Sequence, residues 1–273
     1  MQTATPGQIA VSAQRPVRQV HSDSLAPLDR LDRLDRLIVA LDFPTAAAAM
    51  LMVDQLEGTC RWFKVGMELY YAAGNSVIQQ LLERGFKVFL DLKLHDIPNT
   101  VAGAVRSVSG AGASLLTIHA GGGAQMMRAA AQAAALPDAP DLLAVTVLTS
   151  MDAAELTGVG VSVDIDSADP VEPQVLRLAR LAQASGIDGL VCSAEEVAAV
   201  RQAMGQGVRL VVPGIRPALP AGAEVRDDQR RVATPAQAIA RGASMLVVGR
   251  PITQAADPAE AAAAILAEIQ AAD

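Results

Sequence analysis

The stretch "KVFLDLKLHDIPNT", residues 87–100, decides how the chain is interpreted. Its first eight residues are rich in Val, Phe and Leu, which is typical of a β-strand. Two charged residues, Asp91 and Lys93, interrupt this apolar run, and Asp96 follows just beyond its predicted end. Because burying a charge is costly unless it is paired, these side chains must meet partners or a ligand.

Alternation along the predicted strand separates its leucines from its charges. The face that would pack against helices carries Val88, Leu90, Leu92 and Leu94. The opposite face carries Phe89, Asp91, Lys93 and His95. Asp91 and Lys93 are therefore predicted neighbours, roughly 6–7 Å apart along the strand. The alternative interpretation of these two residues alone is a buried ion pair that only fills space.

Apolar runs of the same kind recur eight times after residue 36. The predicted strands cover residues 37–42, 61–66, 87–94, 114–120, 142–150, 188–193, 208–214 and 244–250. Ala-rich stretches with helical character separate them, and a last helix over 257–272 closes the chain. Eight strand–helix units predict an α/β fold, a single-domain (β/α)8 TIM barrel over residues 37–273. The alternative is an open doubly wound sheet, but no G-x-G-x-x-G follows the first strand.

Residues 1–36 do not look like part of the core. They are polar with scattered prolines, and they end in the tandem repeat "LDRLDRLDRL", residues 28–37. The leucine period of three differs from the 3.6 residues of an α-helical turn. We expect a flexible N-terminal extension, disordered or a frayed helix, without a catalytic part.

Composition excludes several classes of protein. A net charge of −7 argues against a nucleic-acid-binding surface, and no apolar run reaches membrane-spanning length. The two cysteines, Cys60 and Cys192, match neither a metal spacing nor a disulfide framework. A reducing compartment follows, and we expect the cytoplasm. Arg15 and Arg18 precede the first acidic residue, Asp23, which gives the N-terminus a faint resemblance to a transit peptide. We rank import into an organelle below a cytoplasmic location.

Lysine is scarce in this sequence. The chain has 22 Lys and Arg residues, of which only Lys64, Lys87 and Lys93 are lysines. An ammonium can give up a proton and a guanidinium cannot, so a retained lysine indicates chemistry that needs a lysine. Chance is the alternative, and we accept it for Lys87, which lies at the start of its strand.

Active sites of TIM barrels lie at the carboxyl ends of the strands. Polar or turn-forming residues occupy most of these positions here: Asp42, Lys64, Asp91, Lys93, Asp96, His119, Thr149, Ser150, Ser193, Pro213, Gly214, Arg216, Gly249 and Arg250. A single such residue is usually a solvated strand end. A set that converges on one face of a barrel predicts an active site.

The loops after the seventh and eighth strands predict a phosphate site. They read "VVPGIRP" and "VVGRPIT", and phosphate sites of these barrels lie in those two loops. Gly214 and Gly249 would allow close approach of backbone N–H groups, while Arg216 and Arg250 supply bidentate donors. The long segment 213–234, which contains Gln229, is predicted to be a lid.

The motifs "ALDFP", "FKVGMELYY", "DLKLHDIPNT", "LTSM", "PGIRP" and "VVGRPIT" occur in this order. From about Leu37 onward the chain resembles the orotidine 5′-phosphate decarboxylase family. The D-x-K-x-x-D pattern at 91–96 alone also resembles a related barrel group, the Mg²⁺-dependent ketogulonate-phosphate decarboxylases and hexulose-phosphate synthases. The tail before Leu37 has no counterpart in the family pattern.

The resemblance implies decarboxylation of orotidine 5′-phosphate to UMP and CO₂ in pyrimidine biosynthesis, with no cofactor and no metal. Lys64, Asp91, Lys93 and Asp96 would form the catalytic network, and Lys93 would protonate C6. Two other functions stay open: a Mg²⁺-dependent sugar-phosphate decarboxylase or aldolase, and a non-catalytic barrel that binds a phosphate ligand.

The resemblance also implies the substrate contacts and a homodimer. Asp42 and Lys64 would hold the ribose, Thr149 and Ser150 the pyrimidine, and the residues expected at the phosphate are Arg216, Gln229, Gly249 and Arg250. Asp91 and Pro213 would also contact substrate. Asp96 and Thr100 would reach into the active site of the partner subunit.

Overall fold

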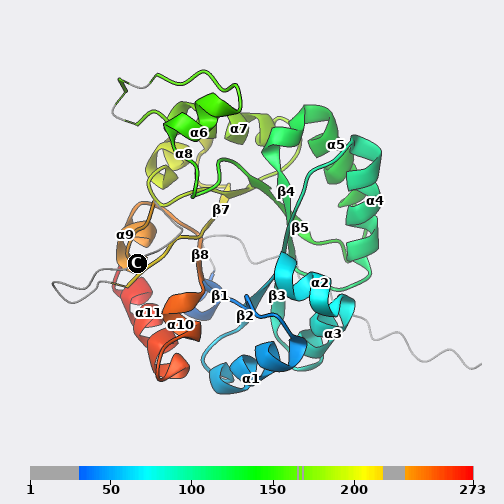
Figure 1. Ribbon diagram of the computed structural model, residues 1–273, viewed down its shortest axis with the longest axis vertical. Coiled ribbons are helices and arrows are strands. Elements are labelled where there is room, and N and C mark those ends of the chain that lie inside the picture. The colour runs from blue at the N-terminus through cyan, green and yellow to red at the C-terminus, as the bar shows by residue number, and fades with distance from the viewer. Residues whose placement is uncertain (1–30, 165, 168, 218–230, 273) are drawn as a thin grey trace, which may run out of the picture.

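Eight parallel strands form a closed barrel in sequence order (Figure 1). The computed structural model describes residues 31–164, 166–167, 169–217 and 231–272 of the 273-residue chain. The first strand pairs with both the second and the eighth, so the sheet has no free edge. The strands are β1 Leu37–Ala40, β2 Trp62–Gly66, β3 Lys87–Leu94, β4 Leu115–His119, β5 Asp141–Val145, β6 Gly189–Val191, β7 Arg209–Val212 and β8 Met245–Val248.

Helices surround the barrel and cover the outer face of its sheet (Figure 1). Two helices, not one, follow β2, β5 and β8, and the short α10 begins at Arg250, directly after β8. The helices are α1 Ala46–Leu56, α2 Met67–Ala73, α3 Asn75–Glu83, α4 Pro98–Ser109, α5 Gly123–Ala133, α6 Ala153–Gly158, α7 Glu172–Gln183, α8 Val197–Met204, α9 Pro235–Ala240, α10 Arg250–Thr253 and α11 Pro258–Ala272. None in the described ranges is long and apolar enough to cross a membrane.

The predicted (β/α)8 barrel is confirmed, and the open doubly wound sheet is excluded by the pairing of β1 with β8. Several strands end earlier than predicted. The fifth was expected to reach residue 150 but ends at Val145. Thr146 still donates its backbone N–H to the carbonyl of Val191, and the following residues leave the ladder. The apolar Val147 and Leu148 instead line a cavity above the barrel, which explains why their sequence reads like a strand.

The core has two parts, as alternation along the strands requires. A small cluster fills the barrel interior: Ile38, Ala40, Trp62, Phe89, Leu115, Leu143, Val211, Met245 and Val247. A larger cluster lies between sheet and helices and includes Val88 and Leu90, with Leu92 and Leu94 packed against it. The predicted outward face of β3 is therefore confirmed.

The segment just before β1 is ordered and packs against the base of the barrel. Residues Arg33–Asp35 form a 3₁₀ helix, which has three residues per turn and so accommodates the three-residue period of the sequence. Asp35 is only 6% exposed and accepts a hydrogen bond from the indole Nε1 of Trp62 at 2.8 Å. Arg61 also donates to Asp35 at 2.8 Å. The last residues before β1 thus form a tight turn held by a buried carboxylate. Residues 1–30 of the extension that was expected to be disordered or a frayed helix lie outside the described part.

Candidate active site

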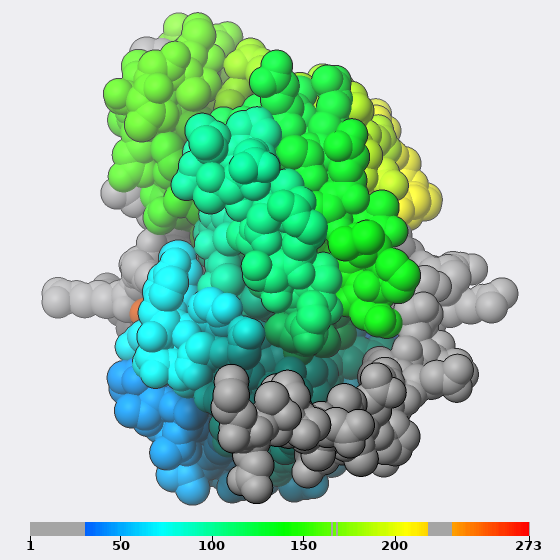
Figure 2. Space-filling view, turned by 90° about the vertical axis from the view of Figure 1, so that its right-hand side faces the viewer, coloured from blue at the N-terminus to red at the C-terminus, as the bar shows by residue number. Residues whose placement is uncertain are grey.

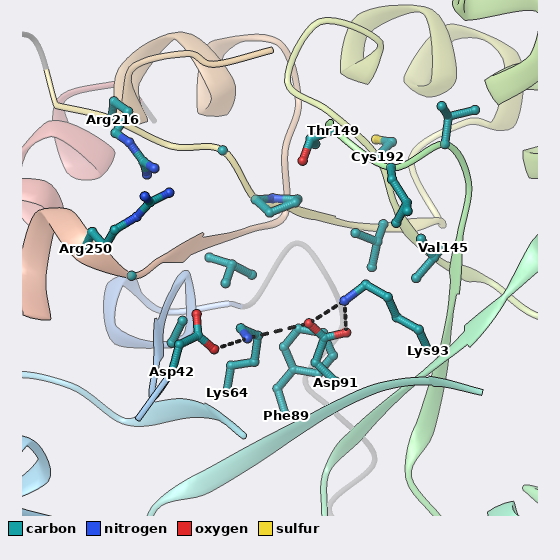
Figure 3. Close-up of a pocket in the computed structure, with 18 of the residues that line it drawn as sticks. Asp42, Lys64, Phe89, Asp91, Lys93, Val145, Thr149, Cys192, Arg216 and Arg250 are labelled. Atoms are coloured by element: carbon teal, nitrogen blue, oxygen red, sulfur yellow. Dashed lines mark hydrogen bonds and ion pairs between the residues drawn. The ribbon is translucent and has the colours of Figure 1, made fainter. Parts of the chain in front are cut away.

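A cavity of about 430 Å³ opens at the carboxyl ends of the strands (Figure 3). It has a charged floor, an apolar wall and two arginines at one side. Its lining comprises Ala40, Asp42, Lys64, Phe89, Asp91, Lys93, Val145, Val147, Leu148, Thr149, Val191, Cys192, Pro213, Gly214, Arg216, Val247, Gly249, Arg250 and Gln254. Seven of the eight strands, or the loops that follow them, supply these residues. All of them lie at the carboxyl end of the barrel, where TIM-barrel sites lie.

Four residues of alternating charge form the floor, and we call Asp42, Lys64, Asp91 and Lys93 the charged array. Lys64 Nζ lies 2.8 Å from an Asp42 carboxylate oxygen and 3.6 Å from one of Asp91. Lys93 Nζ donates to both Asp91 oxygens at 2.9 Å. Each cation lies beside an anion, so the mostly buried Lys64 and Asp91 keep their charges paired, while Asp42 is 58% exposed.

Asp91 is the centre of the array, and its side chain is 13% exposed. Burial alone raises the pKa of this carboxyl, but the two lysine ammoniums and the hydrogen bonds from Lys93 and Thr117 outweigh burial. The net effect holds the pKa of Asp91 below its ordinary value. Asp91 is therefore an ionised carboxylate at neutral pH and acts on neighbouring groups through its negative charge.

The backbone of β3 is irregular where it carries Lys93. Leu90 pairs with Leu116 and Leu94 with Ile118, so three residues of β3 stand opposite one residue of β4, Thr117. Lys93 has φ 48°, a left-handed conformation that costs a non-glycine residue about 1–2 kcal/mol. Such strain persists only where the surroundings impose it, and it clusters at functional sites.

Room for the array comes partly from Gly66 at the end of β2. A Cβ atom added there would lie 2.9 Å from Lys64 Nζ and 3.1 Å from Asp42 Oδ1. Any side chain at this position would therefore push against the Lys64–Asp42 ion pair. Alternation places residue 66 on the same inner face as Lys64, so the sequence contained a signal for this role.

The wall opposite the floor is apolar and includes the thiol of Cys192. Burial raises the pKa of Cys192 to about 12, so the group is a neutral thiol at pH 7. It acts as a small apolar surface rather than as a nucleophile. Thr149 places a hydroxyl on the same side of the cavity (Figure 3).

Arg216 and Arg250 enter the cavity from the loops after β7 and β8, and their guanidinium groups point toward one another (Figure 3). Gly214, with φ 76°, makes the left-handed turn that leads to Arg216. Two guanidinium groups that face each other across a cavity can both donate hydrogen bonds to one anion. This geometry suits a phosphate group. Gln254, which follows α10, also lines this part of the cavity and was not singled out from the sequence.

Some predicted site residues lie elsewhere. Ser150 is exposed and does not line the cavity, although its neighbour Thr149 does. Asp96 and Thr100 are exposed on the β3–α4 connection and on α4, also outside the cavity. Gln229 falls outside the described residues. The strand-end residues His119 and Ser193 do not line the cavity either. The other predicted site residues all line it: Asp42, Lys64, Asp91, Lys93, Thr149, Pro213, Gly214, Arg216, Gly249 and Arg250.

His95 departs from the face predicted by alternation. The irregularity at Lys93 breaks the two-residue period, and His95 does not line the cavity. Its ring stacks on that of His119, with centroids 5.1 Å apart. Burial lowers the pKa of His119, and nearby His95 and Lys93 lower it further. His119 is therefore neutral at pH 7 and packs as a ring.

A buried ion pair behind the apolar wall was also missed. Arg231 donates to the carboxylate of Glu196, which is fully buried, and its other nitrogen donates to the carbonyl of Leu148 at 2.9 Å. Glu196 in turn accepts the backbone N–H of Ser193 at 2.9 Å. The pair therefore ties together the loops after β5, β6 and β7. Nothing in "SAEEV" distinguishes the buried Glu196 from its exposed neighbour.

Within the described ranges, no group of three His, Cys, Asp or Glu residues is arranged to hold a metal ion. The acidic residues of the cavity, Asp42 and Asp91, are each held by a lysine ammonium instead.

Fold and cavity together define a TIM-barrel protein with a charged, phosphate-compatible site at the carboxyl ends of its strands. The chain belongs to the orotidine 5′-phosphate decarboxylase / HUMPS family, whose sequence profile matches residues 35–265.

Individual relatives agree with this assignment. The chain is 54% identical over 238 residues to the orotidine 5′-phosphate decarboxylase of Halorhodospira halophila, covering 87% of this chain and 97% of that protein. It is 53% identical over 232 residues to the enzyme of the same name from Anaeromyxobacter dehalogenans, covering 85% and 97%. Among solved structures, it is similar to the orotidine 5′-phosphate decarboxylase of Lactobacillus acidophilus, with a TM-score of 0.73, 39% identity and coverage of 86% and 99%.

Proposed function

We propose that this chain decarboxylates orotidine 5′-phosphate to UMP and CO₂ without a cofactor, in pyrimidine biosynthesis. The observation that carries the proposal is the charged array in one cavity with two facing arginines. Relatives that bear this enzyme's name match the chain over almost their whole length, which supports the same reaction here.

In the proposed reaction the bond from C6 to the carboxylate breaks, and its electron pair stays on C6. The Lys93 ammonium stabilises this developing carbanion electrostatically and then donates a proton to C6. The lysine becomes a neutral amine and regains its proton from solvent after the products leave. Asp91, 2.9 Å from Lys93 Nζ, holds the ammonium in place.

Asp91 has a second effect in this scheme. Its carboxylate would lie beside the substrate carboxylate, and two like charges at close range repel each other. The repulsion disappears as CO₂ leaves as a neutral molecule, so the contact favours the transition state over the ground state. The lowered pKa of Asp91 keeps this carboxylate charged at neutral pH.

The rest of the cavity would hold the substrate in register. Asp42 and Lys64 would bind the ribose hydroxyls, and Thr149 and Pro213 would contact the pyrimidine. Arg216, Gly249 and Arg250 would bind the phosphate, with Gln229 as a further contact. The phosphate is remote from C6, but its binding energy can be used to organise the reacting end.

We also propose a homodimer in which Asp96 and Thr100 complete the site of the other subunit. Both residues are exposed and lie outside the cavity of their own chain. Ile97, next to Asp96 in sequence, is 67% exposed, and Tyr71 on α2 is 78% exposed. Figure 2 views the side of the molecule on which α2, α4 and α5 form the surface. Contact with a second subunit would remove these side chains from water.

Mixing two inactive variants tests the shared site. Lys93→Ala and Asp96→Ala chains should each be inactive as homodimers. A mixed dimer would contain one intact site, so random exchange of subunits should recover about one quarter of wild-type activity. No recovery in a mixture that mass spectrometry shows to contain mixed dimers would refute the shared site.

The decisive test of the function is a spectrophotometric assay with orotidine 5′-phosphate. We expect turnover by the wild-type chain, none by Lys93→Ala, and no effect of a chelator. The D-x-K-x-x-D pattern also fits the sugar-phosphate group, so a Mg²⁺ requirement with a sugar-phosphate substrate would favour that alternative. Binding of phosphate ligands without turnover of either substrate would favour a non-catalytic barrel.

The compartment we propose is the cytoplasm. Cys60 and Cys192 are both free and buried, which fits a reducing environment.

A further inference from the structure

Thr117, in the middle of β4, is a fully buried polar residue beneath the cavity. Its hydroxyl joins two members of the charged array. Thr117 Oγ1 donates to Asp91 Oδ1 at 2.9 Å, and it accepts the backbone N–H of Lys93 at 2.8 Å. No sequence motif pointed to this residue, although alternation from Leu115 places it on the inner face.

The direction of both hydrogen bonds is fixed by chemistry. An ionised carboxylate can only accept and a backbone amide can only donate, so the hydroxyl proton must point to Asp91. The hydroxyl has one donor and two acceptor positions, and these contacts use the donor and one acceptor. A methyl or hydrogen in place of the hydroxyl would leave the Lys93 amide without this partner and Asp91 with one hydrogen bond fewer.

The contact occurs where the β3–β4 ladder fails. Residues 91–93 of β3 stand opposite Thr117 alone, so the Lys93 amide takes a side-chain acceptor in place of a strand partner. Lys93 is also one of only two non-glycine residues in the described part of the chain with positive φ. The hydroxyl of Thr117 thus holds the unusual backbone that carries the ammonium.

We propose that Thr117 is a positioning residue, which sets the Lys93 backbone and the Asp91 carboxylate relative to one another for proton delivery. The proposal rests on the proposed decarboxylation. Without the hydroxyl, Lys93 can relax toward an extended conformation and its ammonium shifts relative to C6. The ribose and phosphate contacts come from β2 and from the loops after β1, β7 and β8, none of which is hydrogen-bonded to Thr117, and we expect them to be retained.

Two substitutions separate positioning from packing. Thr117→Val keeps the shape and removes the hydroxyl, while Thr117→Ser keeps the hydroxyl and removes a methyl group. A misplacement of about 1 Å can cost about 100-fold in rate, so we expect the kcat of Thr117→Val to fall roughly 10- to 100-fold. Thr117→Ser should stay within about threefold of wild type, because it rescues the hydrogen bonds.

UMP binding separates the two roles, because a structural role of Thr117 predicts weaker binding in the variant and a positioning role does not. UMP affinity, measured by calorimetry, should change less than about threefold in Thr117→Val, because the loops that bind ribose and phosphate are intact. A general loss of site structure would weaken binding and turnover together. Circular dichroism verifies folding, and if Thr117→Val does not fold, Thr117→Ala compared with Thr117→Ser measures the same difference.

Three results would overturn the positioning role. These are a kcat of Thr117→Val within about threefold of wild type, a Thr117→Ser variant as slow as Thr117→Val, or a parallel loss of UMP binding. Failure of the wild-type chain to decarboxylate orotidine 5′-phosphate would instead refute the proposed function, so the two outcomes are distinguishable.

Discussion

Replacing Glu196 with Gln should destabilise the barrel strongly, although the two side chains have almost the same shape. Glu196 is 0% exposed, and its partner Arg231 is 8% exposed. The substitution removes the carboxylate that contacts the buried Arg231 guanidinium, and only the charges of Glu195 and Asp169 then act on it. Gln can still accept the Ser193 N–H through its amide oxygen, so the lost charge dominates the effect.

The magnitude follows from burial. Removing one partner of a buried ion pair costs about 3–5 kcal/mol, and the retained shape and backbone contact place this substitution near the lower end, about 3 kcal/mol. For a domain of this size, 1 kcal/mol shifts Tm by about 2–4 °C. We therefore expect Tm to fall by about 6–12 °C.

Thermal melts followed by circular dichroism at pH 7 measure this loss. Glu83→Gln, the same change at an exposed residue of α3, is the matched control and should stay within about 0.5 kcal/mol of wild type. Adding Arg231→Met to Glu196→Gln removes the stranded charge and should recover part of the lost stability. A Tm loss below about 2 °C for Glu196→Gln, or a double variant less stable than the single one, would refute the reasoning.

Three further outcomes can be checked independently. Gly189→Ala should cost about 1–3 kcal/mol in urea unfolding, because its Cβ would lie 2.6 Å from the Leu142 carbonyl oxygen, whereas Gly110→Ala meets open space and should not destabilise. The pKa of Asp91 is lower in the folded than in the unfolded chain, so its contribution to stability is complete above the ordinary carboxyl pKa of about 3.9 and is lost as pH falls through the folded value. The stability of wild type relative to Asp91→Asn should therefore be constant from about pH 8 to 5 and decrease below about pH 4; an increase toward acid would contradict this sign. Arg250→Ala should lower kcat/KM for orotidine 5′-phosphate by about 100-fold or more, since a bidentate charged contact supplies two hydrogen bonds of about 1.5–3 kcal/mol each, and an unchanged value would remove the phosphate assignment.

The barrel could be predicted because its signal is local and repeated. Eight apolar runs separated by Ala-rich helices leave few topologies, and the parallel sheet closes through β1 and β8 as expected. Active sites of TIM barrels lie at the carboxyl ends of the strands, and this rule directed attention to those ends. Asp91 and Lys93 line one cavity with Arg250, which is far from them in sequence, while their catalytic and binding roles stay predictions.

The features of the site that could not be predicted from the sequence depend on departures from regular strand geometry. Alternation assumes an unbroken strand, so the extra residues opposite Thr117 and the positive φ of Lys93 could not be foreseen, nor could the exit of His95 from the inner face. The Glu196–Arg231 pair joins residues 35 positions apart through loops without a periodic pattern. Such contacts depend on how loops pack, which no local pattern encodes.

The contacts at the base of the barrel make the fold insensitive to the number of Leu-Asp-Arg triplets that precede β1. The contacts of Asp32 and Asp35 need only the last two Leu-Asp-Arg units before Leu37, and the sequence contains three. A slippage event that adds or removes one triplet leaves the same six residues in front of β1. Length variation in this repeat should therefore be silent for the fold, whereas a single-residue insertion after Asp35 would displace the carboxylate from the Trp62 indole.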